Sequence, residues 1–141
     1  GYYNIYYRDL SPEIFQEKLS NTFEYIINNG ATPVMILDVP LMYKNYDCAF
    51  YNKSLGLDRN CNVEKNQSLK LNNKMLDIVN FLKNKYKNAI FIDPTKYMCD
   101  QTECFSSDEE GLFYVDTSHT TYYAGQYVAK KYLEQNKNPF K

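Results

Sequence analysis

The hydrophobic pattern near the start of the chain predicts an amphipathic helix. Ser11 can cap a helix, Pro12 suits the first helical position and Glu13 places an acid in the first turn. Apolar residues then return on one face until Gly30, which suits the position just after a helix end. These apolar residues are Phe15, Leu19, Phe23, Ile26 and Ile27. We therefore expect a helix that ends at Gly30.

Two short apolar runs predict strands. One spans residues 33–39 and is bounded by prolines, and the other spans residues 89–92 and stops at Asp93. Such runs are typical of parallel strands that are covered on both faces. Between them, residues 63–86 have apolar positions at helical spacing and predict a second amphipathic helix, with Leu71, Met75, Ile78, Val79 and Leu82 on its apolar face. Residues 41–62 lack periodicity and predict the longest loop.

The last third of the chain predicts a hairpin-like segment and a final helix. An apolar run at 112–115 follows an acidic turn, and either Thr120 or Thr121 can cap a helix that carries apolar residues on one side. The apolar residues of this helix are Ala124, Tyr127, Val128, Ala129 and Leu133. The alternation of helices and strands predicts an α/β fold, specifically a doubly wound, three-layer sandwich with a mainly parallel sheet.

Functional groups of doubly wound sheets lie beyond the carboxyl ends of the strands. In this chain those positions are Asp38, Asp93 and the segment after Val115. Asp38 and Asp93 could border a site, but the interpretation favoured here is that each caps a turn. The segment after Val115 is therefore the place where chemistry is expected.

Length and charge limit the classes of protein. The 141 residues, 44% of them hydrophobic, predict one domain over 1–141. The 16 basic and 17 acidic residues nearly balance, which argues against a nucleic-acid partner. No apolar run approaches the roughly 18 residues of a membrane span. The chain starts at Gly1 without a signal-peptide pattern, so we expect it to be part of a longer protein.

The four cysteines form two local pairs in the sequence, Cys48 with Cys61 and Cys99 with Cys104. Zinc sites usually have closer doublets, and the single histidine lies elsewhere, so no metal site is expected. Two disulfides are favoured over free thiols. Disulfides persist in oxidising compartments, which predicts a location in the periplasm or at the cell surface.

The single histidine stands in a pattern that suits general base catalysis. Asp116 and His119 are separated by one turn between an apolar run and a helix, so the carboxylate can bind the imidazole Nδ1 and leave Nε2 free. These are the acid and base members of a serine-hydrolase triad. The alternative is a loop histidine beside an aspartate that only caps a turn.

The chain resembles the SGNH hydrolase domains that are fused to membrane-bound acyltransferases of the acyltransferase-3 family. The resemblance covers about residues 15–130 and is most specific in the block that contains Asp116 and His119. The matching residues outside that pair are Asp93-Pro94, Cys99, Cys104, Gly111 and Tyr114. The helix start departs from the family pattern, because Thr120-Thr121 replaces Leu-Ser and Ala124-Gly125 inverts Gly-Ala.

A nucleophilic serine is not recognisable in this sequence. SGNH enzymes carry it in an N-terminal Gly-Asp-Ser block, which does not occur here. Ser118 adjoins His119 and is poorly placed to reach Nε2, while Ser11 is explained as a helix cap and Ser106 and Ser107 by an acidic turn. The other serines are Ser20, Ser54 and Ser68. We expect the chain to be the C-terminal portion of a larger SGNH domain, inactive without its N-terminal segment.

The resemblance implies O-acyl or O-acetyl transfer to a cell-surface glycan, or ester hydrolysis on it, for example on lipopolysaccharide or peptidoglycan. His119 would be the general base and Asp116 its orienting carboxylate, without a cofactor. The implied partners are the missing N-terminal SGNH segment, a membrane acyltransferase domain that supplies the acyl donor, and the glycan acceptor. A soluble domain tethered to a membrane protein outside the cytoplasm would fit. The alternative is a noncatalytic extracytoplasmic module that binds carbohydrate or protein.

Overall fold

The computed structural model describes residues 11–43, 47–70 and 73–141. Its residues divide into two compact units, which are described separately. The first unit draws on the ranges Gly1–Ile36 and Leu71–Ile92, and the second on Leu37–Lys70 and Asp93–Lys141. The start of the chain at Gly1 and position Leu71 of the expected second helix lie outside the described residues.

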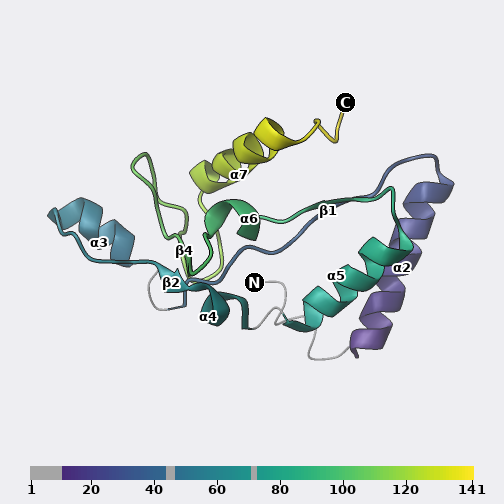
Figure 1. The fold of residues 1–141 in the computed structure, drawn as a ribbon, viewed down its shortest axis with the longest axis horizontal. Helices are drawn as coiled ribbons and strands as arrows, with labels where there is room; N and C mark the ends of the chain where they lie inside the picture. The colour runs from purple at the N-terminus through teal and green to yellow at the C-terminus, as the bar shows by residue number, and fades with distance from the viewer. Residues whose placement is uncertain (1–10, 44–46, 71–72) are drawn as a thin grey trace. The chain divides into compact units, whose positions relative to one another are not determined.

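Among its described residues, the first unit is formed by two helices and two parallel strands. Helix α2 (Pro12–Asn28) begins where the sequence predicts, because the Ser11 hydroxyl accepts a hydrogen bond from the Ile14 N–H. It lies beside α5 (Asn73–Lys85) (Figure 1). Strand β1 (Val34–Ile36) pairs in parallel with β3 (Ile90–Ile92). Both strands are shorter than the apolar runs that contain them.

The core of the first unit joins the helices to the strands. Phe23 of α2 and Leu82 of α5 are buried, and Met35 and Phe91 of the paired strands pack against this cluster. The buried Tyr86, which follows α5, is joined to α2 because its hydroxyl donates to the Ser20 carbonyl at 3.1 Å. Amphipathic spacing along both helices therefore builds this core as the sequence predicts.

The second unit combines several short elements with a 14-residue helix around its own core. They are α3 (Cys48–Leu55), β2 (Val63–Glu64), α4 (Lys65–Leu69), α6 (Thr95–Met98), β4 (Glu103–Cys104) and α7 (Tyr122–Gln135). Strands β2 and β4 pair antiparallel (Figure 1). Met42, Met98 and Phe113 are almost fully buried in the core, with Ala124 of α7. Thr121, one of the two predicted caps, accepts from the Ala124 N–H and starts α7.

Two local expectations are wrong in this unit. Residues 48–55 form α3 within the expected loop 41–62; the helix ends at Gly56, whose φ of 63° suits glycine. Val63 does not begin the second amphipathic helix but pairs with Cys104 in a β ladder. The expected hairpin-like segment at 112–115 is present, formed by isolated antiparallel bridges, Ser107 with Leu112 and Tyr114 with Thr120, in place of longer strands.

The structure is α/β, with helices and a small parallel sheet. The parallel pairing of β1 and β3 agrees with the expectation from their apolar runs. Within residues 11–43, 47–70 and 73–141, no helix has the length and apolar content to span a membrane.

Both predicted disulfides are present, and both belong to the second unit. Cys48 at the start of α3 bonds to Cys61, with Cα atoms 5.4 Å apart. Cys99 bonds to Cys104 in the core, with Cα atoms 3.9 Å apart, and these two residues also form a β bridge. The disulfides therefore hold both a peripheral helix and the centre of the unit.

Candidate functional site

The Asp116–His119 pair is formed by a tight loop between Tyr114 and α7. The Tyr114–Thr120 bridge and the hydrogen bond from the Val115 N–H to the His119 carbonyl close the loop at its base. Inside it, Asp116 Oδ1 accepts from the backbone N–H of Ser118 at 2.8 Å and of His119 at 2.7 Å. Its other oxygen, Oδ2, lies 2.6 Å from His119 Nδ1. One carboxylate thus shapes the loop and orients the imidazole.

Contacts to the preceding part of the second unit hold this loop in place. The Met42 N–H donates to the Thr117 carbonyl at 2.9 Å. The buried Tyr114 donates from its hydroxyl to the Pro40 carbonyl at 2.8 Å. Burial, together with the nearby charge of Asp38, raises the pKa of Tyr114, so this hydroxyl remains a donor at physiological pH.

The electrostatics of the pair favour an ionised aspartate and a fixed imidazole tautomer. The hydrogen bonds from the Ser118 N–H, from the His119 ring and from the His119 N–H hold the pKa of Asp116 well below its usual range. An ionised Asp116 can only accept, so His119 Nδ1–H must be the donor. The neutral imidazole then carries its lone pair on Nε2, and the side chain is 62% exposed. Nε2 of His119 can therefore accept a proton from a group that approaches from the solvent side.

The other sequence-predicted acids do not hydrogen-bond to this pair within the described part of the chain. Asp38 accepts from the Val39 N–H at 2.9 Å, and Asp93 accepts from the Thr95 N–H at 3.0 Å near the start of α6. These are local turn and helix-start contacts, which is the role favoured from the sequence.

Several serines make contacts that belong to the fold or to the Asp116 loop. Ser118 Oγ lies 3.5 Å from Asp116 Oδ1, on the carboxylate side of the pair. Ser106 and Ser68 are buried, and Ser68 donates to the Leu41 carbonyl. Ser11 caps α2 as expected. Among the residues that the structure describes, no group of three or more histidine, cysteine or acidic side chains is arranged to hold a metal ion.

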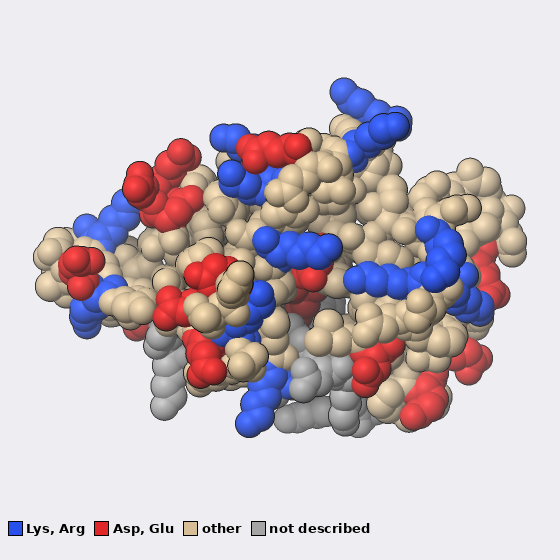
Figure 2. Space-filling model, in the orientation of Figure 1, with Lys and Arg blue, Asp and Glu red and all other residues tan. Residues whose placement is uncertain are grey.

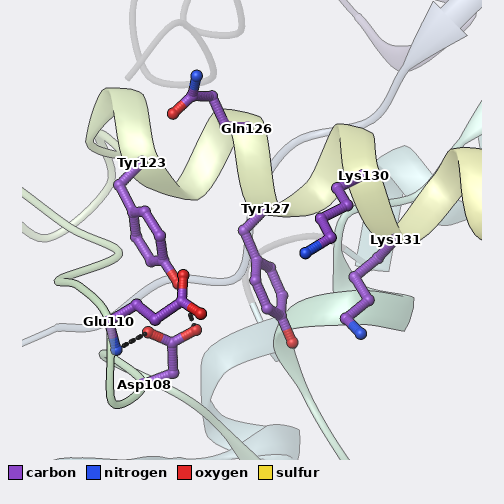
Figure 3. Close-up of a pocket in the computed structure, with 7 residues that line it drawn as sticks. All are labelled: Asp108, Glu110, Tyr123, Gln126, Tyr127, Lys130 and Lys131. Carbon is purple, nitrogen blue, oxygen red and sulfur yellow. Dashed lines mark hydrogen bonds between the residues drawn. The ribbon is translucent and has the colours of Figure 1, made fainter.

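A groove on α7 was missed by the sequence analysis. It lies between this helix and the acidic turn before Leu112 (Figure 3). Its lining residues are Asp108, Glu110, Tyr123, Gln126, Tyr127, Lys130 and Lys131. The sequence carried one signal for this groove, the helical spacing of Tyr123, Tyr127 and Lys130 along one face of the predicted helix. The same spacing is also typical of residues that face a core, so the groove could not be predicted from it.

A comparison with protein-family models identifies the family of this chain. A family model described as "SGNH domain (fused to AT3 domains)" matches residues 1–134. The chain belongs to this family of hydrolase-like and acyltransferase-like domains, as its motifs indicate. No curated protein and no solved structure gives a significant match.

Proposed function

We propose that this chain supplies the base and its orienting carboxylate for O-acyl or O-acetyl transfer to a cell-surface glycan, or for ester hydrolysis on that glycan. The observation that carries the proposal is the 2.6 Å contact between Asp116 Oδ2 and the Nδ1 of an exposed His119. The family match supports ester chemistry in general. The openness of the pair favours catalysis over a noncatalytic module, in which a closed, structural pair would be expected.

The proposed reaction follows from the free Nε2 lone pair. His119 takes the proton of a serine hydroxyl as its oxygen attacks the acyl carbonyl, and then returns that proton to the departing alcohol. The acyl-serine is next attacked by a glycan hydroxyl in transfer, or by water in hydrolysis, with His119 again accepting the proton. His119 then returns this proton to the serine oxygen as the acyl–serine bond breaks, which restores the free base and the serine hydroxyl. Asp116 stabilises the imidazolium in both halves.

The serine is proposed to come from a segment N-terminal to this chain in a longer protein. The chain is then the C-terminal portion of one SGNH domain, whose complete form is a doubly wound, flavodoxin-like three-layer sandwich. The fusion to an acyltransferase-3 domain in this family suggests a membrane domain that delivers the acyl donor. The two disulfides suggest an extracytoplasmic location, where lipopolysaccharide or peptidoglycan would be accessible.

A fluorophosphonate probe and an acetyl-ester assay on the full-length protein test this function. The full-length protein should label on a serine outside residues 1–141, and the isolated chain should not label. His119→Ala should abolish turnover, and Asp116→Asn should lower kcat by about 10³-fold to 10⁴-fold because an amide presents the wrong partner to Nδ1.

Asp93→Asn is the matched control, since it changes a carboxylate that accepts a backbone hydrogen bond at a helix start. It should retain the parent rate within about threefold. Parent rates in well-folded His119→Ala and Asp116→Asn proteins would contradict the proposal and favour the noncatalytic module. Stoichiometric labelling of a serine in the isolated chain would contradict the missing-nucleophile part of it.

A further inference from the structure

The groove on α7 has a volume of about 300 Å³ and lies wholly within the second unit. Tyr123 and Tyr127 project from the same side of the helix, Tyr123 toward the turn that carries Asp108 and Glu110, and Lys130 follows along the helix (Figure 3). Aromatic walls with a few polar groups at the rim are typical of small-molecule sites.

The wall formed by Tyr123 is fixed by several contacts. Its hydroxyl donates to Asp108 Oδ2 at 2.6 Å, and Asp108 Oδ1 accepts from the Glu110 and Gly111 N–H groups at 3.0 and 2.9 Å. The ring stacks on the buried Phe113 with centroids 5.9 Å apart. A Cβ atom added to Gly111 would lie 2.5 Å from the Tyr123 ring, so glycine permits this close approach.

The same contacts determine the ionisation states of Asp108 and Tyr123. Burial opposes ionisation of Asp108, but the hydrogen bonds from Tyr123 and the backbone outweigh it and lower the pKa of this carboxyl. The same hydrogen bond raises the pKa of Tyr123. Asp108 therefore stays ionised and Tyr123 stays neutral across a wide pH range. Because they hydrogen-bond to each other, neither of these two groups is free to bind a ligand.

Other polar groups of the groove remain available to a ligand. The structure shows no hydrogen bond from the Tyr127 hydroxyl or the Lys130 ammonium, and none to the Glu110 carboxylate, within the described residues. Tyr127 is positioned by its ring, which packs on Phe113 with centroids 4.9 Å apart. A hydroxyl, an ammonium and a carboxylate thus offer both donors and acceptors beside two half-buried rings.

The charge balance indicates which ligands fit. The two acids and two lysines that line the groove balance in formal charge, so charge alone does not select an ion. Of the lysines, Lys131 is paired with Glu134 at 3.3 Å and lies 5.9 Å from the Tyr127 ring centroid, which leaves Lys130 as the free cation among the described lining residues. Figure 2 likewise shows acidic and basic side chains interspersed on the face that it draws. A ligand with apolar ring faces and many hydroxyl groups satisfies both the rings and the free donors and acceptors. We propose that this groove binds a neutral hexopyranose unit.

The groove lies on the helix that immediately follows the Asp116–His119 loop. Tyr122 to Lys130 covers roughly 12 Å of helix at 1.5 Å per residue. A sugar held there could belong to the same glycan chain whose hydroxyl is acylated. That role as acceptor rests on the proposed function, whereas the binding itself does not require any turnover.

The test is a ¹H–¹⁵N NMR titration of the 141-residue chain with the methyl glycosides of glucose, galactose, mannose and N-acetylglucosamine. At least one should bind with a Kd on the order of 1 to 10 mM and shift the amides of Gly111, Tyr127 and Lys130. Tyr127→Ala should raise that Kd about tenfold, and Glu110→Gln and Lys130→Ala should each raise it about threefold. The last two are surface changes that leave the Phe113 packing intact.

Tyr122→Ala is the matched control, because Tyr122 lies on the same helix, is 82% exposed and does not line the groove. It should leave the Kd within about twofold, as should His119→Ala. The inference is overturned if none of the four glycosides shifts the groove amides at about 50 mM, if inorganic phosphate alone does so, or if Tyr122→Ala weakens binding as much as Tyr127→Ala. Binding that survives when the full-length protein proves inactive would separate this inference from the proposed function.

Discussion

At the scale of single residues, Asp116 has two tasks that depend on its ionised form. Its Oδ1 accepts two backbone N–H groups that shape the loop, while its Oδ2 orients His119. The low pKa of Asp116 is the expected result of that many donors. The residue that would tune the base is therefore also a residue that stabilises the local fold.

Asp116→Asn should destabilise the isolated chain in a pH-dependent way. The folded-state pKa of Asp116 is depressed, so its contribution to stability is present above the unfolded value of about 3.9 and is lost as the pH falls below it. Urea unfolding should show a difference between parent and variant that is largest at neutral pH and shrinks progressively below about pH 4.

Asp58→Asn is the control for that experiment, since Asp58 is exposed and its carboxylate accepts no hydrogen bond in the described part of the chain. Its effect should stay near zero at every pH. An Asp116→Asn difference that is constant with pH would show that the carboxylate charge does not contribute.

The sequence predicts the Asp116–His119 pair because both residues belong to one turn, where spacing alone sets the distance. It does not predict what holds the loop. The hydrogen bond from Tyr114 to Pro40 joins residues 74 positions apart, and the contact from Met42 to Thr117 is similarly distant. Nothing in the local pattern at either end specifies such a partner.

At the scale of elements, two glycines near α7 have opposite surroundings. An added Cβ at Gly111 would meet three atoms of the Tyr123 ring, at 2.5, 2.8 and 2.9 Å, whereas at Gly125, inside α7, nothing lies within 4 Å. Neither glycine needs a positive φ. Gly111 is therefore required for steric reasons, whereas Gly125 only carries the entropic cost that glycine has inside a helix.

Gly111→Ala should destabilise the chain by about 1 to 3 kcal/mol, because the methyl group displaces the Tyr123 ring from Asp108. Gly125→Ala should instead stabilise it by about 0.5 to 1 kcal/mol, because alanine is the better helix former. Chemical denaturation of both variants measures the two effects. Equal effects of the same sign would mean that the Tyr123 contact does not constrain the turn.

Helices with a local start signal or a long apolar face were predicted, as α5 was from its apolar spacing, whereas the short α3 was not. α2 and α7 begin at side-chain caps, Ser11 and Thr121, that can be recognised within four residues. α3 has no side-chain cap bond and spans only Cys48–Leu55, so its apolar face is too short to show a period. Strand β2 is defined by its partner β4, which local propensity cannot supply.

At the scale of the whole molecule, the two units rely on different sources of stability. The first unit is held by the packing of α2 and α5 on β1 and β3 and contains no cysteine. The second packs α7 against several elements of eight residues or fewer and contains both disulfides. The division could not be predicted from the sequence, because each unit combines two segments that are separated along the chain.

Reduction of the disulfides should therefore loosen the second unit more than the first. In the chain-entropy model the Cys48–Cys61 link contributes about 3 kcal/mol and the shorter Cys99–Cys104 link about 2 kcal/mol. Native-state hydrogen exchange with and without reductant measures the result. The Phe105 amide, bonded to the Met98 carbonyl, should lose about 30-fold or more of its protection.

The Ile90 amide, which donates to the Pro33 carbonyl in the first unit, is the internal reference for that measurement. Its protection should change by less than about threefold, because no disulfide restrains the segments around it. An equal loss at Ile90 and Phe105 would show that the two units open as one cooperative body. The disulfides would then stabilise the whole chain, including the helices of the unit that lacks cysteine.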